Sequence, residues 1–134
     1  MNKTMNKKIR LGILGGGGDS LIGVLHRVAA NMFDKYEIVG GVFNPNVQEN
    51  IEFAKKIGLN TSRIYKDFET LIEEESKLRS DQKIQVVSVL TPNFLHYPMA
   101  KKLLENDFHV ICEKPLTTTY NEALDLYKIQ KEKL

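Results

Sequence analysis

The stretch Ile9-Arg10-Leu11-Gly12-Ile13-Leu14-Gly15-Gly16-Gly17-Gly18 decides the fold of this chain of 134 residues. Its apolar first part predicts a buried strand, and its glycines open into a helical pattern. Gly15 and Gly17 occupy the first two positions of a Gly-x-Gly-x-x-Gly motif, in which a backbone without Cβ atoms approaches a pyrophosphate closely. The stretch therefore predicts a strand, a phosphate-binding turn and a helix.

The turn departs from the usual motif. Its third position falls on Ser20, and Gly23 follows three residues later. A flexible loop between a strand and a helix is the alternative interpretation of the glycines alone. The strand before them and the helix after them favour dinucleotide binding. We expect the loop to contact the cofactor through Gly15, Gly17, Gly18, Asp19 and Ser20.

Short β-rich runs alternate with helical patterns along the whole chain, which is typical of successive βαβ units. The sequence predicts an α/β fold of the Rossmann type, with a doubly wound parallel sheet between two helix layers. Leu21, Leu25, Val28 and Met32 recur at helical spacing and are expected to press the first helix onto the sheet. Asn46, Asp67 and Thr119 are expected to begin later helices as caps. The expected strands are residues 9–14, 38–43, a short run at 63–65, 84–90 and 110–112.

Composition limits the function classes. The 19 basic and 17 acidic residues are mixed along the chain and give a net charge of +2, so no nucleic-acid-binding surface is predicted. No run is long and apolar enough to predict a membrane span or a signal peptide. The single cysteine, Cys112, favours a reducing, cytoplasmic setting. No spacing of His, Cys, Asp or Glu predicts a metal site. Residues 1–8 are expected to form a disordered tail before one domain over residues 9–134.

The second half of the expected site follows two later strands. Thr91-Pro92-Asn93-Phe94-Leu95-His96 ends the strand at 84–90, and His109-Val110-Ile111-Cys112 runs into Glu113-Lys114-Pro115. The carboxyl ends of parallel strands line the ligand crevice of an open α/β sheet. Lys114 could there bond a substrate hydroxyl and assist proton transfer while hydride leaves the same carbon. A cis Lys114–Pro115 bond is a plausible way to aim the side chain. Asn93 is expected to cap a helix, to contact the cofactor, or both.

The end of the second strand selects between NAD and NADP, because a carboxylate there repels the 2'-phosphate of NADP. That place falls on Asn44, with Pro45 and Asn46 after it. Since no carboxylate excludes the phosphate and no arginine stands next to it, NAD(P) is expected with NADP slightly preferred.

Together, Gly15–Gly18, Thr91–His96 and His109–Leu116 resemble the N-terminal half of the glucose-fructose oxidoreductase and inositol dehydrogenase (Gfo/Idh/MocA) family. The resemblance implies an NAD(P)-binding Rossmann domain and a second, sheet-rich domain for sugars or polyols that is absent here. It implies that Lys114 is the catalytic lysine and that Glu113 orients it. It further implies that the cofactor is lined by Gly15, Gly17, Thr91, Asn93 and His96. We expect Pro92, Glu113 and Lys114 to contact the cofactor as well.

We therefore expect the cofactor domain of an NAD(P)-dependent dehydrogenase that converts a secondary alcohol of a sugar or polyol to a ketone. The chain stops on a helix with no following strand, so it is expected to be a fragment without full catalysis. A non-catalytic nucleotide-binding or redox-sensing module is the alternative. Exposed sheet-edge or helix surface predicts a homo-oligomer.

Overall fold

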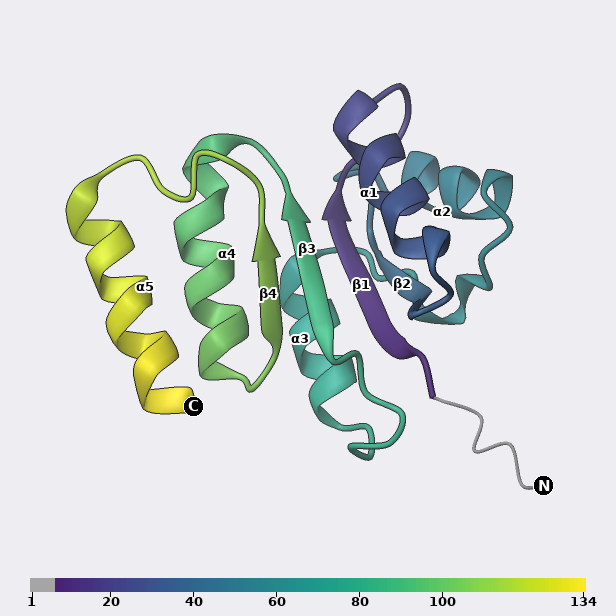
Figure 1. Ribbon diagram of the computed structural model, residues 1–134. Helices are drawn as coiled ribbons and strands as arrows, with labels where there is room; N and C mark the ends of the chain where they lie inside the picture. The colour runs from purple at the N-terminus through teal and green to yellow at the C-terminus, as the bar shows by residue number, and fades with distance from the viewer. Residues whose placement is uncertain (1–6) are drawn as a thin grey trace.

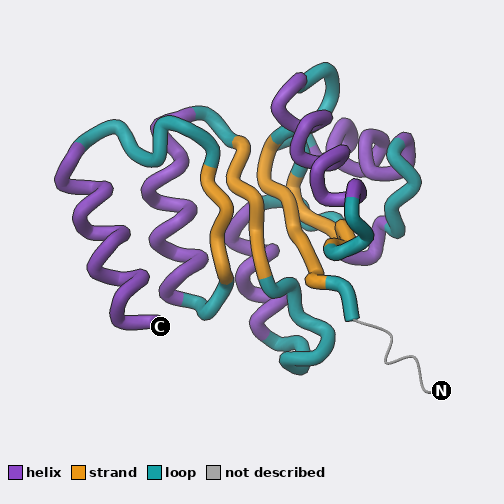
Figure 2. Tube along the Cα trace, in the orientation of Figure 1, coloured by secondary structure: helices purple, strands orange, loops and turns teal. Residues whose placement is uncertain are grey.

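The computed structural model describes residues 7–134 and arranges them in three layers, with helices on both faces of one sheet (Figures 1 and 2). The four strands lie in the order β2-β1-β3-β4, and every neighbouring pair is parallel. The expected Rossmann-type α/β fold is confirmed. In chain order the elements are β1 (Ile9–Gly15), α1 (Leu21–Met32), β2 (Tyr36–Val42), α2 (Val47–Lys56), a 3-10 turn η1 (Thr61–Arg63), α3 (Phe68–Ser76), β3 (Val86–Leu90), α4 (Asn93–Glu105), β4 (His109–Cys112) and α5 (Tyr120–Lys133).

Most of the expected tail, residues 1–6, lies outside the described residues. Lys8, the last residue of that expected segment, pairs with Asp34 beyond the end of α1. Ile9 then begins β1.

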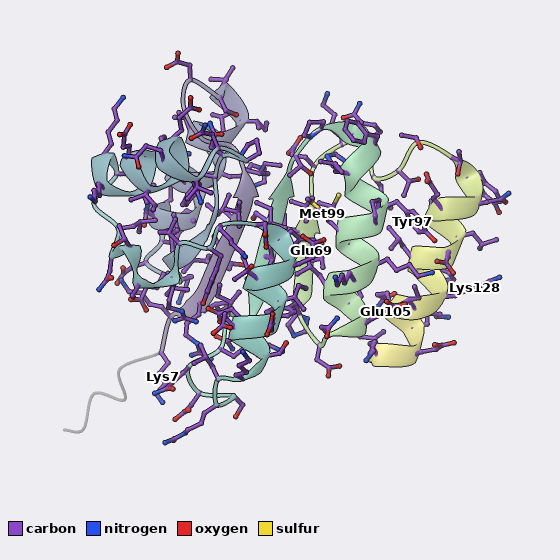
Figure 3. The ribbon with its side chains drawn as sticks, turned by 180° about the vertical axis from the view of Figure 1, so that it is seen from behind. Lys7, Glu69, Tyr97, Met99, Glu105 and Lys128 are labelled. Atoms are coloured by element: carbon purple, nitrogen blue, oxygen red, sulfur yellow. The ribbon has the colours of Figure 1, made fainter. Side chains whose placement is uncertain are left out.

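Each face of the sheet has its own apolar core. On one face Leu11 and Ile13 of β1 pack with Ala30 of α1 and Ala54 of α2. On the other face Leu14 of β1 packs with residues of α3 and α4. That second cluster contains Leu14, Phe68, Leu71, Ile72, Ile84, Val87, Val89, Leu103 and Phe108. The last helix, α5, lies outside α4 (Figure 1), and the Tyr97 hydroxyl of α4 donates to Asp125 of α5 at 2.7 Å. Figure 3 shows Tyr97 on the side of α4 that faces α5.

Local sequence signals begin three helices where they were expected. Asn46, Asp67 and Thr119 are the N-caps of α2, α3 and α5, and each side chain accepts a backbone N–H of the first turn. At Thr119 the Glu122 side chain reaches back to the cap, which completes a capping box. These predictions are confirmed because a cap depends only on residues within one turn.

The apolar stripe of α1 faces solvent, contrary to the expectation that it would press onto the sheet. The exposed fractions are 72% for Leu21, 52% for Leu25, 55% for Val28 and 65% for Met32. Gly23 and Ala30 are the buried residues of the helix. A Cβ on Gly23 would lie 1.8 Å from the Gly16 carbonyl oxygen, so only a face of small residues can approach the glycine loop this closely.

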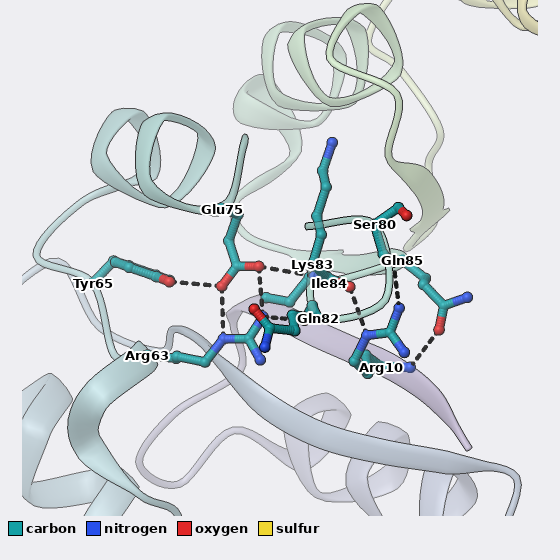
Figure 4. Close-up of polar contacts among 9 residues, drawn as sticks. All are labelled: Arg10, Arg63, Tyr65, Glu75, Ser80, Gln82, Lys83, Ile84 and Gln85. Atoms are coloured by element: carbon teal, nitrogen blue, oxygen red, sulfur yellow. Dashed lines mark hydrogen bonds and ion pairs between the residues drawn. The ribbon is translucent and has the colours of Figure 1, made fainter. Parts of the chain in front are cut away.

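Residues 63–65 do not form the expected third strand. Arg63 ends the 3-10 turn η1, and only Ile64 bridges to Gly41 at the edge of β2. The Arg63 side chain instead donates to both oxygens of Glu75, with its Nε at 2.8 Å and its Nη2 at 2.6 Å. Glu75 is fully buried and also accepts from Tyr65 and from the Ile84 N–H (Figure 4). This buried pair joins η1, α3 and the segment that leads into β3.

Candidate functional site

The carboxyl ends of the parallel strands meet at one edge of the sheet, at the top of Figure 1. A pocket of about 440 Å³ opens there between the ends of β1, β2 and β3 and the starts of α3 and α4. Its wall includes four of the residues expected at the cofactor: Gly15, Asn44, Thr91 and Pro92. Figure 3 labels Glu69 on α3 and Met99 on α4, which line the pocket on the α3 and α4 face of the sheet.

The glycine loop makes a tight turn between β1 and α1. Gly15 and Gly16 have φ angles of 78° and 70°, a region that L residues with side chains rarely adopt. A Cβ on Gly15 would lie 2.9 Å from the Leu90 carbonyl oxygen. Ser20 caps α1 and accepts the Gly23 N–H at 3.1 Å. Within the described residues, the N–H groups of Leu21 and Ile22 donate to no backbone acceptor, so the helix presents free donors to an anion.

Gly17, Gly18 and Asp19 continue the same loop. The Gly17 N–H donates to the Phe43 carbonyl at 3.2 Å, and this bond ties the loop to the end of β2. Gly18 has a φ of 58°, and both Gly18 and Asp19 are exposed. The free donors and the glycine backbone fit the phosphates of a dinucleotide.

Gly23→Ala tests the close approach of α1 to the loop. The new Cβ would meet backbone 1.8 Å away, so α1 must move, and we expect a loss of about 3 kcal/mol of unfolding free energy. That loss exceeds the gain of about 1 kcal/mol that alanine brings to a helix interior. Urea denaturation measures the difference. Val24→Ala, one residue along on the exposed side, is the control and should stay near wild type; a Gly23→Ala variant as stable as wild type would contradict the prediction.

The side chain of Asn44, at the end of β2, is held by two bonds. Its amide nitrogen donates to the Glu49 carboxylate at 2.7 Å, and its oxygen accepts the Asn46 N–H at 2.8 Å. Glu49 therefore brings a carboxylate to the position that the sequence left neutral. This residue was missed because it stands on α2, five positions beyond Asn44.

The segment after β3 differs in detail from its expected roles. Asn93 is the first residue of α4 and is exposed, whereas Pro92 is the N-cap and makes no side-chain cap bond, so the expected Asn93 cap is wrong. His96 is only 1% exposed. Its Nδ1 lies 2.7 Å from the Pro115 carbonyl oxygen, and its Nε2 lies 2.8 Å from that of Thr91.

The loop after β4 carries Lys114 at the same edge. The peptide bond between Lys114 and Pro115 is cis, as the sequence analysis considered. The Lys114 side chain is exposed and has no hydrogen-bond or ion-pair partner in residues 7–134. Glu113 lies 3.0 Å from His26 Nε2, and this bond with His26 lowers the pKa of the Glu113 carboxyl. The His26–Glu113 contact joins the glycine-loop helix to the lysine loop.

Cys112 and Arg27 have structural surroundings. Burial and the nearby Glu113 raise the pKa of the Cys112 thiol to about 11, so it is protonated near neutral pH. Arg27 donates to the Gly16 carbonyl at 2.8 Å and lies over the Phe53 ring, 5.0 Å from its centroid. Burial lowers the pKa of Arg27. Sequence reasoning did not identify Gly16 as a pocket residue, or Arg27 as the side chain that holds the Gly16 carbonyl. The helical spacing that puts Arg27 on the side of α1 facing the loop was a usable signal.

Residues 7–134 contain neither a membrane-spanning helix nor a cluster of metal ligands. No helix there is long and apolar enough to cross a membrane. No group of three or more His, Cys, Asp or Glu side chains there is placed to hold a metal ion.

Comparison with known proteins identifies relatives over the whole domain. A family model described as "Oxidoreductase family, NAD-binding Rossmann fold" (GFO_IDH_MocA) matches residues 9–134. The oxidoreductase YfiI of Bacillus subtilis is 34% identical over 132 residues, which are 98% of this chain and 33% of YfiI. The scyllo-inositol 2-dehydrogenase (NADP(+)) IolW of the same species is 28% identical over 127 residues, which are 93% of this chain and 31% of IolW. This chain thus spans about a third of these relatives.

A solved structure gives the same match. An inositol dehydrogenase homolog from Azotobacter vinelandii, complexed with NAD+, superposes with a TM-score of 0.89 and 39% sequence identity. The superposition covers 95% of this chain and 32% of that chain. The same homolog has been solved with NADH and myo-inositol.

Proposed function

The chain belongs to the Gfo/Idh/MocA family of oxidoreductases with an NAD-binding Rossmann fold, and from this premise we propose that it is the NAD(P)-binding domain of a sugar or polyol dehydrogenase. The reaction interconverts a secondary alcohol and a ketone. When bound, the nicotinamide accepts or donates the hydride. The chain's own residues hold the dinucleotide and handle the proton.

One observation carries this proposal. His26 of the glycine-loop helix contacts Glu113, the neighbour of Lys114, at 3.0 Å. The phosphate-binding turn and the lysine loop therefore form one edge instead of two separate features. A free ammonium group at this edge is what proton transfer to or from a substrate oxygen needs.

The proposed roles follow from position. The loop from Gly15 to Ser20 would bind the pyrophosphate, with the free N–H groups of α1 as donors. Asn44 would lie at the adenosine ribose. Thr91, Pro92 and Asn93 would line the crevice toward the nicotinamide. Lys114 would hold or pass the proton at its Nζ, and Glu113 would orient it.

Calorimetric titration of this chain with NADH and NADPH in turn tests the proposal. We expect micromolar binding of at least one, because the positive φ angles of Gly15, Gly16 and Gly18 suit a turn that a pyrophosphate can approach closely. The absence of binding to both would contradict the proposed function. Binding without turnover, once a substrate domain is supplied, would favour a nucleotide-binding or redox-sensing module.

The same titration decides cofactor preference. Asn44 permits NADP, which the sequence analysis slightly prefers, whereas the Glu49 carboxylate 2.7 Å from the Asn44 amide would repel a 2'-phosphate. Glu49→Gln should raise NADPH affinity relative to NADH by roughly fivefold, a difference of about 1 kcal/mol. Glu52→Gln, one turn further along α2, is the control. An unchanged ratio in Glu49→Gln would show that Glu49 does not select the cofactor.

We further propose that copies of the chain associate and that the protein works in the cytoplasm. The solvent-facing stripe of α1, formed by Leu21, Leu25, Val28 and Met32, supports association because it contains no charged residue. Light scattering that gives a monomer at every concentration would contradict it. The free Cys112 thiol fits a reducing compartment.

A further inference from the structure

His96 lies between two segments that meet at the site. It is on the first turn of α4 and is 1% exposed. Its ring touches the carbonyl of Thr91, at the end of β3, and the carbonyl of Pro115, after β4. Both contacts are short, at 2.8 and 2.7 Å. The side chain therefore links the two strand ends that border the crevice.

The two contacts use both ring nitrogens. A ring N–H can donate to a carbonyl oxygen, which only accepts hydrogen bonds. Turning the ring over would put carbon atoms against both carbonyls. The two carbonyls together therefore fix the orientation of the ring.

The residues before and after Lys114 each contact a histidine. On one side Glu113 contacts His26, and on the other the Pro115 carbonyl contacts His96. The ammonium end of Lys114 itself is free within the described residues. Tyr97 is next to His96 in the sequence, and Cys112, Glu113 and Lys114 precede Pro115. None of these ionisable groups is a hydrogen-bond partner of the His96 ring.

We propose that His96 is a positioning residue that fixes the Lys114 loop by contacting the Thr91 and Pro115 carbonyls at the same time. The role of Lys114 rests on the proposed function, but the link that His96 makes between the two carbonyls does not. His96 acts through Pro115 and has no nitrogen left for the cofactor, in contrast to the direct cofactor contact that the family resemblance implies.

A pair of variants tests the positioning role. The side-chain amide nitrogen of Asn can take the place of His Nδ1, so His96→Asn can keep the bond to the Pro115 carbonyl. The amide nitrogen of Gln can take the place of Nε2, so His96→Gln can keep only the bond to the Thr91 carbonyl. We expect His96→Gln to weaken NADH binding and to speed amide exchange at Glu113 by about tenfold each, because it loses the bond to Pro115 that holds the loop. His96→Asn should stay within about threefold of wild type, since it keeps the bond that holds the loop.

Two readouts separate a local effect from general loosening. The Glu113 N–H donates to the Val89 carbonyl at 3.1 Å and reports on the lysine loop, whereas Val87 in the centre of β3 reports on global unfolding. His109→Gln, at an exposed histidine, is the control. Equal effects of His96→Gln and His96→Asn would overturn the positioning role. If wild type binds neither dinucleotide, the proposed function fails, while Glu113 exchange still decides the role of His96.

Discussion

Lys114→Ala is expected to lower turnover by roughly 100- to 10,000-fold, the range in which a positioned proton-transfer group contributes. The reason is that the Lys114 ammonium is exposed at the carboxyl edge of the sheet and has no partner in residues 7–134, so it is available to a substrate oxygen. Cofactor affinity should change far less than turnover, because the phosphates are held by the glycine loop.

The measurement needs a substrate domain. A suitable enzyme is a chimera in which this chain replaces the matching third of the Azotobacter vinelandii inositol dehydrogenase homolog, with myo-inositol as substrate. Lys128→Ala, at an exposed position of α5, is the matched control and should turn over like the unsubstituted chimera. Lys114→Ala with turnover within a few-fold of the control would remove Lys114 from the mechanism.

Arg63→Ala is expected to lower the free energy of unfolding by roughly 3–5 kcal/mol, because it leaves a buried carboxylate without its cation. Glu75 is fully buried and accepts two bonds from Arg63, at 2.8 and 2.6 Å (Figure 4). Urea denaturation of the chain at pH 7 gives the difference. Arg79→Ala is the matched control, since Arg79 also pairs with a carboxylate, at 2.7 Å, but in solvent. Its effect should be too small to separate from zero.

The pH dependence of this pair has a definite sign. Burial alone would raise the pKa of Glu75, but the bonds from Arg63, the Ile84 N–H and Tyr65 outweigh it and hold the pKa below its ordinary value. A carboxyl whose pKa is lowered by folding stabilises the protein above its unfolded pKa of about 4.3, and that stabilisation is lost as the pH falls through the folded pKa.

The difference between wild type and Arg63→Ala should therefore be largest at neutral pH and shrink in acid. The double variant Arg63→Ala with Glu75→Gln removes the unpaired charge and should be more stable than Arg63→Ala alone. A deficit that is equal at pH 7 and in acid would mean that Arg63 stabilises the fold by packing only.

The sequence predicted what short-range chemistry decides. Asn46, Asp67 and Thr119 begin helices because their side chains bond N–H groups within one turn. The glycines and the strand before them predicted the turn for the same reason. The alternation of strands and helices was enough to predict the fold class, because few topologies join parallel strands through helical crossovers.

The features that the sequence did not predict depend on contacts that reach beyond one helical turn. The stripe of α1 has helical spacing, but Gly16 and Gly23 decide which side meets the sheet. Arg63 lies outside the sheet, and its side chain pairs with Glu75, which is twelve residues later in the chain. The bonds of His96 to Pro115 span 19 residues, and no local pattern announces them.

The order β2-β1-β3-β4 puts the pocket at the place where the chain's two halves part, since β1 leads to β2 on one side and β3 to β4 on the other. Gly15 and Asn44 border the pocket from the first half, and Thr91 and Pro92 from the second. A molecule bound there contacts both halves at once and therefore cross-links them non-covalently. By mass action, its binding stabilises the folded chain over the unfolded one in proportion to the logarithm of its concentration, and it makes the two halves unfold together.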